Sequence, residues 1–235
     1  MKPPPAKKEV KKIPVDKGPA EAPPVPPEEI IRRFAARETD FRHAYASASF
    51  KQTVRLQEYE EDGEAGGEFL VVHQVTAAPD GVRTSKLVSE IPSTVRRAAV
   101  TPDDLDELAR YAAFFLTAEN VPKYELTYAG TQQVDELNTY AFRVRPRALE
   151  RRTRYFEGVI WVDDRDFEIV RTFGQFVTDV QPAEHVLFTR FETYRDSVAG
   201  KFRFPIYARC DDYIKTKKGE ARLRLTIRFE DFKLP

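Results

Sequence analysis

Residues 155–171 read YFEGVIWVDDRDFEIVR, in which three aspartates separate two apolar runs. The residues facing one way alternate from Phe156 to Val162 and again from Phe167 to Phe173. Alternation with period two predicts strands, and aspartate is favoured in tight turns because its carboxylate accepts hydrogen bonds from nearby backbone N–H groups. The stretch therefore predicts a β-hairpin that turns at Asp163–Asp166.

The same aspartates raise the alternative of a metal site. A helix-flanked calcium loop requires glycine at its sixth position and glutamate at its twelfth. Counted from Asp164, these positions hold Ile169 and Gln175. We therefore expect the aspartates to turn the chain and to bind no metal.

The residue types that usually carry catalysis form no recognisable pattern. His43, His73 and His185 are far apart and fit no HxxxH or HExxH motif, and Cys210 has no base near it in sequence. The chain also lacks a GxSxG motif and a glycine-rich phosphate loop. We expect a protein that is not an enzyme and that carries no cofactor.

Most of the chain repeats the period-two pattern of the opening stretch. Strands are predicted at Phe50–Leu56, Phe69–Val75, Tyr140–Val144, Phe202–Ile206 and Leu223–Phe229, among roughly ten in all. Short turns such as Asp80-Gly81 and Lys218-Gly219 join them. The predicted class is mainly β (α+β), with antiparallel strands.

Two segments have helical periodicity instead. The first begins near Pro26, with Glu28 and Glu29 in its first turn and an apolar stripe at Ile30, Phe34, Phe41 and Tyr45. The second begins at Thr101-Pro102, with a stripe at Leu105, Leu108, Ala112 and Phe115. A sheet of this length curls, so we expect an open antiparallel half-barrel lidded by two or more helices.

The interior of such a half-barrel is lined by alternate strand residues. The predicted lining is Phe142, Val144, Ile160, Val162, Phe204, Ile206, Leu223, Leu225 and Ile227. Whether this interior is packed or partly hollow is left open by the sequence.

Composition narrows the class of partner. Thirty-eight basic residues balance 38 acidic ones, so no overall field attracts nucleic acid. The longest uncharged run, Phe69–Pro79, has 11 residues, too few for a membrane-spanning helix of about 20. We expect no nucleic-acid partner and no transmembrane segment.

The first 27 residues differ from the remainder. They hold nine prolines and six lysines, and lack the apolar residues that would offset the entropy of ordering. We expect a disordered tail over residues 1–27 and one domain over residues 28–235. Such a spacer is typical after a cleaved export signal, so we expect an exported chain whose signal has been removed.

One charge cluster lies between two predicted strands. Six arginines occur within twelve residues, at positions 143, 145, 147, 151, 152 and 154. A solvated face and a docking site for an anionic headgroup or an acidic partner are both compatible with this run. If it docks an anion, Arg147, Arg151 and Arg152 are the candidate contacts.

Three stretches resemble the periplasmic lipoprotein-carrier superfamily, the LolA/LolB-like fold. ASASFKQTV (residues 46–54) resembles its first strand, the stretch at 155–171 its central hairpin, and LFTRFETYRDSVAGKFRFP (187–205) its late hairpin. The resemblance implies a periplasmic protein that binds lipid or lipoprotein acyl chains inside a curved sheet without chemistry. A protein-interaction or envelope-stress-sensing module of the same fold, which binds another envelope protein, is the alternative.

The resemblance is incomplete at one position. Carriers of this superfamily hold their helical lid with an arginine that precedes a proline on an early strand. Here Ile91 precedes Pro92, so we do not transfer this role to Arg96 or Arg97. This departure weakens the hypothesis of lipoprotein transfer and does not affect the hypothesis of lipid binding.

Overall fold

A computed structural model describes residues 21–60, 63–78, 83–97, 114–151, 153–179, 190–216 and 219–234. The expected second helix, with Leu105, Leu108 and Ala112, lies outside the described residues, as do residues 1–20 of the expected tail. Phe115, the last residue of that predicted stripe, is described and lies outside regular secondary structure.

Helix α1 (Pro27–Ser47) begins with proline and has Glu28 and Glu29 in its first turn, where acidic side chains favour the helix dipole. It ends where Ala48 becomes extended and leads directly into the first strand. All four residues of the predicted apolar stripe are buried. The prediction of this helix is confirmed.

The sheet contains ten strands, which agrees with the predicted number. They are β1 (Ser49–Tyr59), β2 (Ala65–Ala77), β3 (Arg83–Ile91), β4 (Tyr124–Val134), β5 (Leu137–Pro146), β6 (Tyr155–Asp163), β7 (Ile169–Val177), β8 (Phe191–Val198), β9 (Phe202–Thr216) and β10 (Gly219–Lys233). A short 3-10 helix, η1 (Val121–Lys123), precedes β4.

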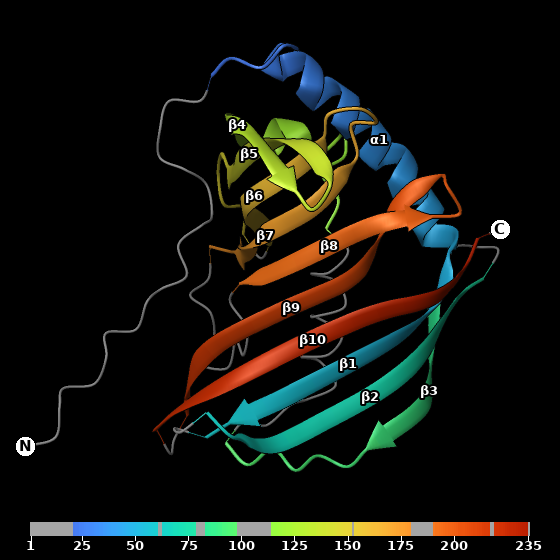
Figure 1. Cartoon of the computed structure of the whole chain (residues 1–235), viewed down its shortest axis with the longest axis vertical. Coiled ribbons are helices and arrows are strands. Elements are labelled where there is room, and N and C mark those ends of the chain that lie inside the picture. The colour runs from blue at the N-terminus through green and yellow to red at the C-terminus, as the bar shows by residue number, and fades with distance from the viewer. Residues whose placement is uncertain are drawn as a thin grey trace, which may run out of the picture.

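The strand order is β3-β2-β1-β10-β9-β8-β7-β6-β5-β4, and every neighbouring pair is antiparallel. The first and last strands of the sheet in chain order, β1 and β10, are therefore partners inside the sheet, and β3 and β4 are its two edges. Figure 1 shows these edges at opposite ends of the curved sheet, with α1 crossing from the β4–β5 end to the start of β1. The fold is the predicted open half-barrel with a helical lid.

Both edge strands carry a β-bulge. The β2–β3 register shifts between Val72 and His73, and the β4–β5 register shifts between Tyr128 and Gly130. Bulges bend a strand away from flat pairing and so discourage edge-to-edge association.

The opening stretch forms the β6–β7 hairpin. Oδ1 of Asp163 accepts hydrogen bonds from the backbone N–H groups of Arg165 (2.8 Å) and Asp166 (3.4 Å). This is the side-chain-to-backbone bonding that makes aspartate a turn residue. The predicted hairpin turn is confirmed.

Candidate functional site: the inner face beneath helix α1

Eight of the nine predicted lining residues lie on the inner face and are at most 2% exposed. They fall into two apolar clusters. The β5–β6 cluster contains Phe142, Val144, Ile160 and Val162, and the β9–β10 cluster contains Phe204, Leu223, Leu225 and Ile227. At these positions the interior is packed.

Ile206, the ninth residue, is half-buried and belongs to neither cluster. The β8–β9 register shifts between Tyr194 and Arg195, which pair with Tyr207 and Pro205, so Ile206 is left without a partner on β8. A bulge re-aims the side chain that it carries. The period-two pattern of the sequence contains no sign of this register shift.

Helix α1 fills the inner face with one stripe of side chains. Its N-terminal half packs into the β5–β6 cluster, where the rings of Phe34 and Phe142 are 6.0 Å apart. Its C-terminal half packs into the β9–β10 cluster, where Phe41 meets Phe204 edge to face at 5.2 Å. The helix thus covers the inner face with its own apolar side chains.

A buried ion pair interrupts this apolar stripe. Glu38 on α1 accepts a hydrogen bond from Arg195 on β8 at 2.6 Å, and the two side chains are 3% and 2% exposed. The second oxygen of Glu38 accepts from the backbone N–H of Leu116 at 3.2 Å. Arg195 also donates to the carbonyl of Phe114 and lies over the ring of Phe41. Two buried charges therefore lie where α1 passes from one cluster to the other.

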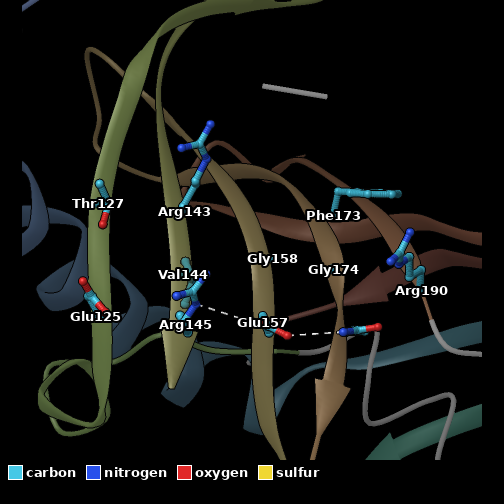
Figure 2. Close-up of a pocket in the computed structure, with 11 residues that line it drawn as sticks. Glu125, Thr127, Arg143, Val144, Arg145, Glu157, Gly158, Phe173, Gly174 and Arg190 are labelled. Atoms are coloured by element: carbon cyan, nitrogen blue, oxygen red, sulfur yellow. Dashed lines mark hydrogen bonds and ion pairs between the residues drawn. The ribbon is translucent and has the colours of Figure 1, made fainter. Parts of the chain in front are cut away.

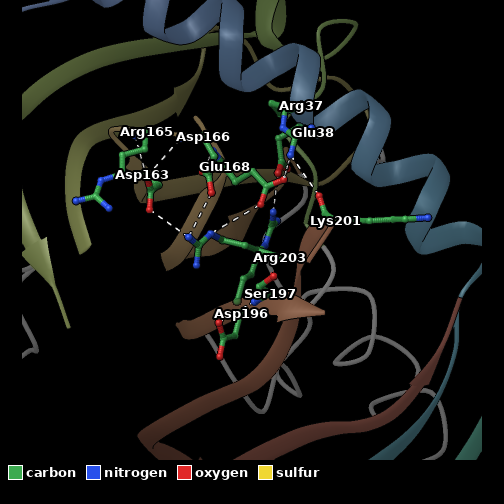
Figure 3. A network of polar contacts seen from close by, with 11 residues as sticks. Arg37, Glu38, Asp163, Arg165, Asp166, Glu168, Asp196, Ser197, Lys201 and Arg203 are labelled. Atoms are coloured by element: carbon green, nitrogen blue, oxygen red, sulfur yellow. Dashed lines mark hydrogen bonds and ion pairs between the residues drawn. The ribbon is translucent and has the colours of Figure 1, made fainter. Parts of the chain in front are cut away.

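A second ionic contact fixes α1 to the β6–β7 turn. Arg37 donates to Glu168, and Arg203 on β9 contacts Asp163 (3.2 Å) and Asp166 (3.3 Å), as Figure 3 shows. Burial raises the pKa of Glu168 above its usual range, although Arg37 and Arg203 oppose the rise. The aspartates thus turn the chain, as predicted, and also bind an arginine that the sequence did not indicate.

A third contact lies at the C-terminal end of α1. Arg83, the first residue of β3, donates to the carbonyl of Tyr45 and lies 4.2 Å from the centre of its ring. A cation is favourable there because helix C-termini carry partial negative charge.

The lid of this protein is therefore held differently from the lid that the resemblance implies. Arg96 and Arg97 give their backbone N–H groups to Glu58, and the Arg97 side chain contacts Glu60 (2.5 Å). No sequence motif marks Arg195, whereas Glu38 has a local signal in the sequence. It lies four residues after Phe34 and three before Phe41, which places a carboxylate inside the apolar stripe.

The outer face of the sheet carries a groove of about 370 Å³, shown in Figure 2. We call it the outer groove; its lining is Glu125, Thr127, Arg143, Val144, Arg145, Glu157, Gly158, Phe173, Gly174, Gln175 and Arg190. It joins two arginines of the predicted run to Arg190, a distant residue in the sequence. Of the predicted docking residues, Arg147 and Arg151 are exposed outside the groove, and Arg152 lies outside the described residues.

The histidines, the cysteine and the carboxylates form no candidate metal site in the described ranges. No group of three or more His, Cys, Asp or Glu suited to a metal occurs there. Cys210 is buried, and His43 and His73 lie on different elements. His185 is outside the described residues.

Within the part of the chain that the structure describes, no helix has the length and apolar character needed to cross a membrane.

Comparison with known proteins gives likenesses of fold. No protein-family model matches the chain, and no curated protein matches its sequence. The chain is similar to a DUF1329 family protein from Desulfovibrio piger, with 12% identity over 88% of this chain and 92% of that chain and a TM-score of 0.42. It is also similar to a LolA superfamily protein from Nitrosomonas europaea, with 12% identity over 88% and 93% and a TM-score of 0.34.

A third similar structure is the MucA/MucB complex of Pseudomonas aeruginosa, with 13% identity over 85% of this chain and 99% of that chain and a TM-score of 0.25. At these identities and TM-scores the likenesses identify no family, no ligand and no partner.

Proposed function

We propose that this protein is a non-enzymatic periplasmic binding protein for lipid or lipoprotein acyl chains, which bind on the inner face after α1 leaves it. In the closed state the stripe of α1 takes the place of the acyl chain. The observation that carries the proposal is the Glu38–Arg195 pair, buried in the middle of the contact between α1 and the sheet.

A buried ion pair is a poor way to fix a helix permanently. Taking two charges out of water costs several kcal/mol per ion, and apolar residues of similar volume often stabilise a protein as well or better. When α1 leaves the sheet, Glu38 and Arg195 regain water, which lowers the cost of opening. The apolar residues around them favour closure, so the contact suits a helix that alternates between two positions.

The face that α1 uncovers would favour an acyl chain. Each buried methylene contributes about 0.8 kcal/mol, so a sixteen-carbon chain gains on the order of 10 kcal/mol before the costs of binding. Opening must cost less than this gain.

The test compares variants that hold or release α1. Arg195→Met leaves Glu38 buried without its cation, so α1 should detach more readily and a fluorescent fatty acid should bind more tightly than to wild type. Glu38→Leu/Arg195→Met replaces both charges by apolar groups, so α1 should stay closed and the probe should be excluded. Arg171→Met is the matched control, because Arg171 pairs with Glu192 on the outer face and should leave probe binding unchanged.

Probe binding that is equal in all four proteins, or absent from wild type and Arg195→Met, would refute the proposal. The second outcome would favour the alternative, a protein-interaction module. Two observations support that alternative: the packing of the eight lining residues, and the exposure of Arg143, Arg145, Arg147 and Arg151 on the outside.

A further inference from the structure

The outer groove follows one row of the sheet. Val144, Gly158, Gly174 and Phe191 lie opposite one another on β5, β6, β7 and β8. Val144 and Phe191 belong to the inner clusters, so this row leaves backbone alone on the outer face. Figure 2 shows the resulting bare floor between the labelled side chains.

Glycine is required at two positions of this row because a Cβ atom there would overlap neighbouring atoms. A Cβ at Gly158 would lie 2.2 Å from the carbonyl oxygen of Phe173, and one at Gly174 would lie 2.6 Å from the ring of Phe156. The two strands therefore approach closely there, and no side chain occupies the floor.

Two walls of different chemistry enclose the floor. One wall follows the next row, Arg143, Val159 and Phe173, and is apolar beyond its arginine. The other holds Arg145, Glu157 and Gln175, joined by contacts of 3.6 and 3.3 Å. Arg190 lies at the far end, next to Phe191.

The arginines of the groove lie at its two ends, with Arg143 and Arg145 on β5 and Arg190 just before β8. On β4, Glu125 lies opposite Arg145. Glu157 is engaged with Arg145 and Gln175 in the middle of one wall. Arg143 is exposed and makes no ion pair with another described residue. A ligand lying on the floor would meet a guanidinium at each end and an apolar wall and a hydrogen-bonding wall between them.

We propose that the outer groove binds an extended peptide segment of a partner protein that carries acidic residues at positions i and i+4. Neighbouring strands are about 4.8 Å apart, so the groove spans roughly 14 Å from β5 to β8. An extended peptide rises about 3.3 Å per residue, so four residues cover roughly 13 Å. Arginine suits carboxylates because its planar donors bind them bidentately.

A peptide fits this surface better than a membrane. Juxtamembrane lipid-binding surfaces present about 4–8 lysines or arginines together. Here the groove holds three arginines and two glutamates: Glu125 lies opposite Arg145 on the neighbouring strand, and Glu157 contacts Arg145 at 3.6 Å. This mixture of charges requires a ligand of defined register, which a peptide has and an anionic lipid surface lacks.

The proposal concerns the face opposite α1 and stands whether or not acyl chains bind inside. It is tested by fluorescence anisotropy with the whole chain and labelled Ser/Gly peptides that carry two aspartates separated by one, three or five residues. We expect the three-residue spacer to bind most tightly and to weaken as salt is added. Arg143→Gln and Arg190→Gln should each weaken it about tenfold, or about 1.4 kcal/mol.

Arg165→Gln is the matched control, because it removes the same charge at the exposed β6–β7 turn and should leave affinity unchanged. Arg143→Glu/Arg190→Glu should instead bind the peptide in which lysines replace the aspartates, which separates loss of charge from loss of fold. The proposal would be overturned if no peptide bound at millimolar concentration, or if affinity did not depend on the spacing of the aspartates. It would also be overturned if anionic vesicles bound through the same arginines and the peptides did not.

Discussion

Breaking the Glu38–Arg195 pair should be far more costly than replacing it. The two side chains are 3% and 2% exposed, and the remaining described partner of the Glu38 carboxylate is the N–H of Leu116. Removing one member of such a pair leaves the other charge buried and costs about 3–5 kcal/mol. Against a total stability of about 5–15 kcal/mol, Arg195→Met should lose about a fifth or more of the free energy of unfolding.

Replacing both members should reverse the loss. Apolar substitutes of similar volume are often neutral or stabilising by about 1–4 kcal/mol, so Glu38→Leu/Arg195→Met should unfold at the same urea concentration as wild type or a higher one. The assay is a double-mutant cycle by urea denaturation, with circular dichroism and tryptophan fluorescence as two probes of the same transition. A single variant within 1 kcal/mol of wild type, or a double variant whose loss equals the sum of the singles, would show that the pair is hydrated and uncoupled.

Three further predictions concern other parts of the sheet. Gly158→Ala should lower the free energy of unfolding by about 3 kcal/mol, because the new Cβ would overlap backbone atoms. Gly200→Ala should lower it by only about 1 kcal/mol, because its Cβ would meet nothing within 4 Å and the cost is that of a positive φ. Equal effects of the two variants in a thermal melt would contradict this. Leu225→Glu should unfold the domain, because Leu225 is 1% exposed in a packed cluster and a buried unpaired carboxylate costs several kcal/mol; a folded variant would reveal water there. Calcium, magnesium or zinc should not shift the melting temperature by binding at Asp163–Asp166, because Asp163 already accepts hydrogen bonds from backbone N–H groups and pairs with Arg203. A shift of several degrees would indicate a metal site at that turn.

Local features of the fold were predictable from the sequence. The hairpin at Asp163–Asp166 and the stripe of α1 depend on residues that are neighbours in the chain, so periodicity alone locates them. The β8–β9 register shift beside Ile206 has no signal in the period-two pattern of the sequence.

The site was predictable only in part. The lining residues of β5, β6, β9 and β10 follow from alternation, but whether the space they enclose is filled depends on where α1 lies. The pairing of Glu38 with Arg195 joins residues that are 157 positions apart. Arg143 and Arg190 line the same groove only because strands β5 to β8 lie side by side. Contacts of this kind come from strand order, which alternation does not specify.

Mass spectrometry of the lipid that co-purifies with the protein tests the proposed exchange of α1 for an acyl chain most directly. Wild type and Glu38→Leu/Arg195→Met would be purified in parallel and their organic extracts compared. We expect an acyl lipid in amounts comparable to the protein in wild type, and its loss from the double variant, in which α1 stays closed. A wild-type protein that carries no acyl lipid, or equal amounts of lipid in both proteins, would contradict it.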